Sequence, residues 1–433
     1  MAGKDKSGNV FSNRNFRLVF LGALVSELGA TLYSFAVSFY ILDISGNNAF
    51  LQGLYLALCG VALLIFTPVG GVLGDRFNKA KIMFLCDYIK GGMIILASIL
   101  MLLLKEPSAQ IAILFCIGIV GNAVSGIFNP AAGALFPHII DEDKLQQANA
   151  YFTIKNSLEG IFGIILAGIL YSALPIHTLF LMVGLCFVAS GISEMFIRYK
   201  HHPSEERMTL RLAARDMADG IRYLKSKKAI LAMMASALFI NFFFTPVSSN
   251  FIPYFVKTDI AGAPSYLFDK LLKPELWSSI FSVCIGISSL VGAAVLSARP
   301  QEEKIGFRTA VRLCLMAGVV IMMAVSYWWF VERGTSLNAF LITFCAGCLM
   351  TGFLVSYVNI PINTTMMRIV DKDKLSKVTS IISIISQGMI PIASVLAGAI
   401  LGSLGSTMLL VICAVGFTAT AVLTIFSHTI REL

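Results

Sequence analysis

Charged side chains are scarce in this chain. Asp, Glu, Lys and Arg make up 13% of its 433 residues, whereas a soluble globular domain carries about 25%. A soluble domain is therefore excluded, because its surface would need more of these groups. Hydrophobic residues make up 57% of the sequence, which indicates an integral membrane protein.

Groups that carry enzyme chemistry are also few. The chain has five His and no G-x-x-x-x-G-K-[ST] loop to hold the phosphates of ATP. Its nine Cys fall within apolar runs, Cys345 and Cys348 included, and their spacing predicts neither a disulfide framework nor a metal site. We therefore predict no catalytic residue, no metal and no cofactor, and neither an enzyme nor an ATP-driven pump.

What the chain does have is long apolar runs, each able to cross about 30 Å of hydrocarbon as a helix. Twelve such runs begin near residues 16, 50, 82, 109, 148, 176, 229, 275, 308, 336, 375 and 404. They are too long for the roughly ten-residue alternating strands of a membrane barrel. The predicted fold class is an all-α integral membrane protein with twelve transmembrane helices, embedded in the lipid bilayer.

Basic residues are divided unequally between the two ends of these helices. With the N-terminus placed inside, 26 of the 33 Lys and Arg fall on one side and five on the other, and Lys90 and Lys155 lie within helices. This asymmetry predicts that both termini are cytoplasmic. The net charge of +9 is then a signal of topology, and no nucleic-acid partner is expected. The polar start leads into a full-length apolar run, so we expect no cleaved signal peptide.

One internal repeat predicts the architecture. Residues 141–170 and 371–400 align at a constant offset, with Asp-Lys-Leu at 143–145 and 373–375 and Leu-Ala-Gly at 166–168 and 396–398. The chain is therefore predicted to contain two pseudo-symmetric six-helix bundles, with a substrate site between them near mid-membrane. The expected parts are a tail (1–15), a bundle (16–198), a linker with an amphipathic helix (199–228), a second bundle (229–427) and a tail (428–433).

A polar stretch, GGVLGDRFNKAK at 70–81, separates the second and third runs. It resembles the motif G-x-x-x-D-R-x-G-R-K of the major facilitator superfamily, and the matching residues are Gly71, Asp75, Arg76, Lys79 and Lys81. The resemblance implies a conformational switch, with Gly71 allowing close helix approach and Asp75 pairing across the seam between the halves. Asn78 replaces the family's Gly, and we expect it to adopt the left-handed turn geometry. The alternative is a plain basic loop, which explains Lys79 and Lys81 but not Asp75.

Further stretches resemble a branch of this family, the bacterial exporters of macrolides and of a catecholate siderophore. They are MFLCD with Asp87, FNPAAGALFPHIIDEDKLQQANA, DMADGIRYLKSKKAI and TPVSSNFIPYF. Two departures bear on energy coupling. Asn122 stands where many proton-coupled drug exporters have Arg, and Gly163-Ile164 stands where antiporters have Gly-Pro.

Polar residues at helical spacing predict which faces line the pathway. In the first run Glu27, Thr31 and Ser34 share one stripe with Ser38. In the seventh run a second stripe has the same spacing: Asn241, Thr245 and Ser248. Amide side chains lie at similar depth in the tenth and eleventh runs: Asn359, Asn363 and Gln387. The alternative is that these groups hydrogen-bond neighbouring helices.

Ionisable residues within the runs are candidate functional groups, because a charge is expensive at membrane depth. Asp87 and Lys90 are three apart, which favours a local ion pair. Lys155 and Glu159 are four apart and also favour a pair, although Glu159 lies deep enough to face the cavity. Glu27 has no basic residue within a helical turn, so it is our first candidate for exchanging protons or binding a cationic substrate.

These features predict a secondary active transporter in a bacterial cell membrane, monomeric and acting on small molecules by alternating access. The resemblance implies export of amphipathic, macrolide-like drugs, as in multidrug resistance, with protons as the coupling ion in an antiport. Export of a siderophore or a lipid-like metabolite, and uptake, are the alternatives, and a channel or receptor is a further one. Aromatic residues in the seventh run suit a bulky apolar ligand or simply face lipid.

Overall fold

A computed structural model describes residues 10–140, 144–199, 222, 228–297, 305–370 and 375–426. The predicted linker helix at 199–228 therefore lies almost wholly outside the described residues. Asp143, Asp373 and Lys374, at the start of the two repeats, lie outside them as well. The side chains of Asp75 and Asn363 are likewise outside the description.

Long helices follow the predicted runs closely. In the first half they are α1 (Arg14–Ile44), α2 (Ala49–Arg76), α3 (Lys79–Leu103), α4 (Pro107–Ile139), α5 (Leu145–Leu158) continued by η3 (Glu159–Gly163) and α6 (Ile164–Ala173), and α7 (Ile176–Met195). A short turn, η1 (Val10–Ser12), precedes α1.

The second half continues with six more spans. The helices are α9 (Lys228–Thr245) with η4 (Pro246–Phe251), α10 (Ile252–Phe255) and η5 (Val256–Ile260), then α11 (Pro274–Ser297), α12 (Ile305–Tyr327) with η6 (Trp328–Glu332), α13 (Leu337–Ile369) and α14 (Leu375–Phe426). Inside α14, Gly405 has a φ of 82°, a left-handed value that glycine adopts without steric penalty. This break divides α14 into two spans, close to the predicted start near 404.

The count of spans agrees with the prediction. Among the described residues, ten helices are long and apolar enough to cross a membrane. One of the ten is the stretch Gln387–Thr424, which contains the break at Gly405. Dividing it there and adding the continuous helical segment from α9 to η5 gives the twelve predicted helices of an all-α membrane protein.

The chain divides into two compact units, and the division does not fall only at the linker. Unit 1 comprises Met1–Val37 and Ala62–Ala213, and unit 2 comprises Ser38–Val61 and Ala214–Leu433. The last turns of α1 and the first half of α2 thus belong to the unit that contains the C-terminal helices.

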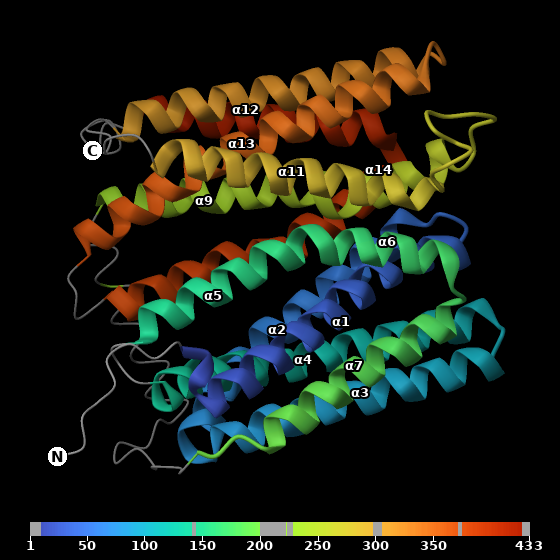
Figure 1. Cartoon of the computed structure of the whole chain (residues 1–433). Coiled ribbons are helices and arrows are strands. Elements are labelled where there is room, and N and C mark those ends of the chain that lie inside the picture. The colour runs from blue at the N-terminus through green and yellow to red at the C-terminus, as the bar shows by residue number, and fades with distance from the viewer. Residues whose placement is uncertain are drawn as a thin grey trace. The chain divides into compact units, whose positions relative to one another are not determined.

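Within unit 1, α3 packs along α7 and beside α4 (Figure 1). Small residues make the α3–α7 contact close: a Cβ added at Gly91 would lie 2.9 Å from Gly184 O, and one at Gly184 would lie 3.0 Å from Gly91 O. One apolar cluster ties the start of α1 to α3, α4 and α5, and its buried members include Phe16, Met83, Leu135 and Ala148.

Within unit 2, α11 packs on α13, and α12 packs on α13 and α14 (Figure 1). The core of this unit is aromatic. Phe251 and Phe255 of the α9–η5 segment are fully buried and contact Tyr327, Phe340 and Phe344. These two aromatic residues of the seventh span are therefore core residues and do not face lipid.

Candidate substrate and proton pathway

Lys155 lies between two carboxylates in unit 1. Its Nζ contacts Glu27 Oε2 of α1 and lies 3.7 Å from Glu159 Oε2 at the start of η3. Thr31, one turn after Glu27, donates its hydroxyl to Glu159 Oε1 at 3.1 Å. The expectation that Glu27 has no cationic partner is wrong, because its partner lies 128 residues away and sequence spacing along one helix cannot show it.

The three side chains differ in exposure. Lys155 is 1% exposed, Glu159 12% and Glu27 46%. One ammonium faces two carboxylates, so the charged cluster has one negative charge in excess. Because an uncompensated charge at membrane depth is unfavourable, this cluster can take up a proton or the cationic group of a ligand, and Glu27 is its accessible member.

The backbone at Glu159 departs from the α-helix. Residues Glu159–Gly163 form a π-helix, a local widening that is frequent at functional sites. A Cβ added at Gly163 would lie 3.3 Å from Leu28 Cδ2 and 3.5 Å from Thr31 Cγ2, so the bulge brings the helix close to α1. The position at which antiporters have Gly-Pro and this chain has Gly163-Ile164 therefore lies at the end of the bulge.

Two other predicted residues of unit 1 take different positions. Ser34 is exposed and continues the stripe of Glu27 and Thr31 along α1. Asn122 donates its amide to Gly118 O at 2.8 Å, within its own helix. Only Glu27, Thr31 and Glu159 of the predicted set are therefore brought together in this unit, and Lys155 joins them.

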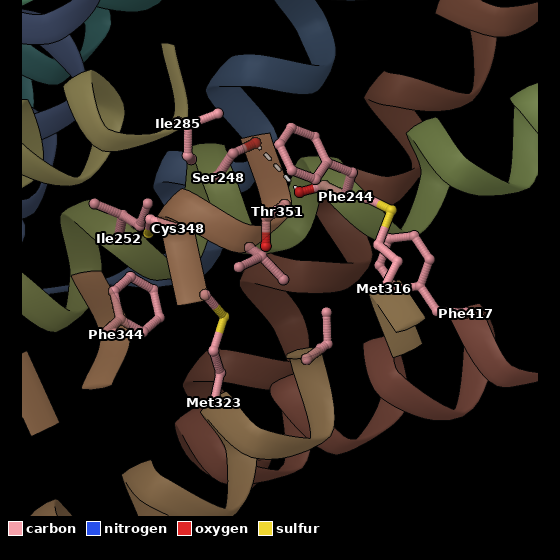
Figure 2. Close-up of a pocket in the computed structure, with 12 residues that line it drawn as sticks. Phe244, Ser248, Ile252, Ile285, Met316, Met323, Phe344, Cys348, Thr351 and Phe417 are labelled. Carbon is pink, nitrogen blue, oxygen red and sulfur yellow. Dashed lines mark hydrogen bonds between the residues drawn. The ribbon is translucent and has the colours of Figure 1, made fainter. Parts of the chain in front are cut away.

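The stripe in the seventh span bonds to its own backbone. Thr245 Oγ1 donates to Asn241 O at 2.8 Å, and Ser248 Oγ donates to Phe244 O at 3.2 Å. Figure 2 shows Ser248 and Thr351 at a cavity of about 20 Å³ lined mainly by apolar side chains such as Phe344. Such a volume holds about one water molecule, so this cavity inside unit 2 is too small for a bulky ligand.

The predicted amides of the tenth and eleventh spans are exposed where they are described. Asn359 of α13 and Gln387 of α14 both have exposed side chains. Asn363 is not described. These residues stay predictions for the pathway.

A larger cavity of about 300 Å³ lies between α12 and α14. Its lining is almost wholly apolar, and two of its residues, Val325 and Val415, are 56% and 62% exposed. This groove lies on the outside of its helix pair, as expected of a surface that faces lipid.

In the stretch 70–81, called the 70s loop below, Gly70 of α2 and Asn78 make the structural contacts described here. A Cβ added at Gly70 would lie 2.5 Å from Gly126 O, whereas one at Gly71 would meet no atom of the described residues within 4 Å. Gly70 is therefore the glycine of this stretch that contacts α4, and the role of Gly71 at the seam between the halves stays a prediction. Asn78 has φ −64° and caps α3 by accepting from the N–H groups of Ala80 and Lys81. Its predicted left-handed geometry is therefore wrong, and capping explains this residue.

The basic residues of this loop differ in environment. Arg76 and Lys81 are exposed, whereas Lys79 is 6% exposed and its Nζ lies 5.9 Å from the centre of the Tyr199 ring. The burial of Lys79 distinguishes it from a lysine whose only role is to fix the membrane topology.

Asp87 lies in a buried cluster between α3 and α7. Within the described residues, no Asp87–Lys90 ion pair forms within 4.0 Å, because Lys90 Nζ lies over the rings of Phe128 and Phe187 at 5.4 and 5.3 Å. The charge of Glu194 acts on both Asp87 and Lys90. Glu194 was not predicted as a site residue, although Ser190 and Glu194 at i and i+4 in an apolar helix were a visible signal.

Lys257 forms a second cluster that the sequence did not single out. Its Nζ lies 2.8 Å from Asp43 Oδ1 at the end of α1 and 2.8 Å from Glu275 Oε1 of α11. Nearby, Gln52 of α2 donates to Ser249 O at 3.5 Å. These contacts hold the α1–α2 turn within unit 2.

Known proteins are similar to this chain in sequence and in fold. The sequence profile of the Major Facilitator Superfamily matches residues 19–394. The uncharacterized MFS-type transporter YkuC of Bacillus subtilis (strain 168) is 24% identical over 384 residues, which is 86% of this chain and 82% of that protein. Macrolide efflux protein A of Streptococcus pyogenes is 22% identical over 311 residues, which is 72% of this chain and 71% of that protein.

One solved structure extends the likeness to three dimensions. A bacterial homologue of the iron transporter ferroportin, in an inward-facing state, has a TM-score of 0.72 at 15% identity, and the match covers 95% of this chain and 98% of that one. At this identity the likeness concerns the fold alone. Because the profile spans most of the chain, the protein belongs to the Major Facilitator Superfamily and is a membrane transporter, not an enzyme.

Proposed function

We propose that this transporter exports amphipathic small molecules and that protons drive the export. The observation that carries the proposal is the pairing of one buried ammonium, Lys155, with two carboxylates, Glu27 and Glu159. Similarity to macrolide efflux protein A supports the direction and the class of substrate. The two halves, 16–198 and 229–427, alternate access with both termini in the cytoplasm, and the chain works as a monomer.

The coupling step is an exchange at the accessible carboxylate. When Glu27 is ionised, it shares Lys155 with Glu159 and the cluster has one excess negative charge. A proton that binds Glu27 removes this charge and leaves Lys155 paired with Glu159 alone. Because protonation changes which carboxylate holds Lys155, it changes how firmly α1 is tied to α5, and a conformational equilibrium can respond to it.

The test is transport of a radiolabelled macrolide in proteoliposomes, with and without a pH gradient. Glu27→Gln imitates the protonated carboxyl and should still exchange macrolide between the two sides, yet lose acceleration by the gradient. Glu106→Gln is the matched control, since Glu106 is exposed at the start of α4. If Glu27→Gln keeps its gradient-driven transport, Glu27 does not couple protons.

A second role for Glu27 is direct binding of a cationic substrate, which its 46% exposure favours. In that case Glu27→Gln should weaken the binding of cationic ligands, spare neutral ones and keep gradient acceleration. A thermal-shift screen with macrolides, catecholates and lysolipids separates drug export from export of a siderophore or a lipid-like metabolite. The direction of macrolide movement in oriented liposomes separates export from uptake.

A further inference from the structure

A pair of buried carboxyl groups lies apart from the proposed pathway, between α3 and α7. Asp87 and Glu194 are each 1% exposed. Among the described residues, neither oxygen of Glu194 has a hydrogen-bond partner, and Asp87 Oδ2 has none. Unpartnered carboxylate oxygens at this depth are strongly unfavourable unless another group or a proton satisfies them.

A hydroxyl group also faces this pair. Ser190, one turn before Glu194 on α7, is 0% exposed, and its Oγ is likewise without a hydrogen-bond partner in the part of the chain that the structure describes. This hydroxyl lies beside the carboxyl group of Asp87, outside the geometry of a hydrogen bond. From α1, a Cβ added at Gly22 would lie 3.2 Å from Ser190 Oγ and 3.6 Å from Glu194 Cγ, so α1 covers the cluster at this glycine.

The charges of the cluster do not balance. The titratable groups that act on the pair are Lys90 and the Cys86 thiol, both on α3, and α4 contributes the ring of Phe128 beneath Lys90. If both carboxyl groups were ionised, one ammonium would face two negative charges inside a helix bundle. One added positive charge would restore neutrality.

We propose that Asp87 and Glu194 form a second proton-binding site, which holds one proton shared between their carboxyl groups. The proton forms an O–H bond to one of the two carboxyl groups, and Lys90 balances the negative charge of the other. A proton fits better here than a metal cation, because a metal cation beside the Lys90 ammonium would be repelled, whereas a bound proton needs no coordination shell. This site is separate from the Glu27, Lys155 and Glu159 cluster.

The site couples protonation to the packing of α3 on α7. Their backbones are in close contact at Gly91 and Gly184, one turn from Asp87, so the interface has little room for water. Loss of the proton leaves a buried negative charge, which favours separation of the two helices. An exposed carboxyl group gives up its proton above about pH 4, whereas the folded chain keeps this one. The folded state then binds more protons than the unfolded state, and stability falls as pH rises.

The test needs no transport assay, so its failure is distinguishable from failure of the proposed function. Infrared spectroscopy of the full-length protein in lipid should show the C=O stretch of a protonated carboxylic acid at about pH 7, and Glu194→Gln should remove it. Asp87→Asn is the second variant, should one of the two fail to fold. Glu106→Gln, on an exposed residue, should leave the band unchanged.

Thermal unfolding in detergent gives the second readout. The melting temperature of the wild type should fall between about pH 5 and about pH 9, and that of Glu194→Gln should fall less, by at least about 2 °C over this range. A wild type without the infrared band overturns the proposal. A rise in melting temperature on adding Na⁺ that Glu194→Gln abolishes also overturns it, since the site would then bind a metal cation.

Discussion

The ammonium of Lys155 contacts the carboxylate of Glu27 across 128 residues of sequence. This contact joins α1 to α5, and Glu159 lies 3.7 Å from the same ammonium. Two further lysines stand among pairs of carboxyl groups: Lys90 near Asp87 and Glu194, and Lys257 with Asp43 and Glu275. Each of the three clusters therefore combines two acidic groups with one basic group.

Removing the ammonium of the first cluster should destabilise the protein. Lys155→Met leaves Glu27 and Glu159 facing each other without a cation, and we expect a loss of about 2 kcal/mol, below the 3–5 kcal/mol of a fully buried pair because Glu27 is half-exposed. The double variant Lys155→Met/Glu159→Gln should recover more than half of this loss. Thermal unfolding in detergent measures both. Equal loss in the single and double variants would show that packing of the Lys155 stem, and not charge, is responsible.

The sequence predicted the helices far better than the contacts between them. Runs of apolar residues mark the twelve spans, and a glycine at 405 marks a break, because hydrophobic length and backbone freedom are local properties. The partner of Glu27 and the role of Glu194 depend on which helix faces are in contact. The spacing of residues along one helix does not reveal these contacts. For this reason the sequence paired Lys155 only with Glu159.

The 70s loop illustrates the same limit on a smaller scale. The motif pointed to Gly71, whereas the close contact of α2 with α4 is made by its neighbour Gly70, which the motif does not mark. Adjacent residues on a helix point about 100° apart, so a motif matched in sequence can locate the turn and still miss the face. The motif also placed Asn78 in the turn, but only the backbone geometry shows that Asn78 caps α3.

Substitution at these two glycines should have opposite results. Gly70→Ala places a Cβ 2.5 Å from Gly126 O and 2.6 Å from Ile127 Cα, and since both are backbone atoms we expect a loss of about 1–3 kcal/mol or more. Gly71→Ala meets no atom of the described part of the chain within 4 Å and should stabilise α2 by up to about 1 kcal/mol. Melting temperatures of the two variants in detergent compare them directly. A similar loss in both would remove the close contact at Gly70 as the explanation.

Weakening the Lys257 cluster should release the α1–α2 turn. Lys257→Gln removes the ammonium that holds Asp43 and Glu275, and because Asp43 is 38% exposed we expect about 1 kcal/mol, or about a fivefold shift between conformations. The readout is thiol labelling of Gln52→Cys in a background without native cysteines, since Gln52 is 0% exposed. Its labelling should become about fivefold faster.

The control for this variant is Lys270→Gln, on an exposed lysine of the same connection between η5 and α11. It should leave the labelling of Gln52→Cys unchanged. If Lys257→Gln does so too, the ion pairs do not hold the turn, and the contacts of α2 with α14 are responsible. Those contacts include Gly53, where an added Cβ would overlap Ser394 O.

Labelling should also distinguish the two polar stripes. Ser34 is exposed on α1, whereas Ser248 lies at a cavity of about 20 Å³ and donates its hydroxyl to Phe244 O. A thiol at Ser34→Cys should therefore react readily with a charged aqueous reagent, and one at Ser248→Cys should react at least about tenfold more slowly, since the cavity holds about one water molecule. Protection of Ser34→Cys by a bound macrolide would place this stripe on the substrate pathway. Fast labelling of Ser248→Cys would mean that the cavity opens during transport. The stripe of the seventh span would then line the pathway in a second conformation.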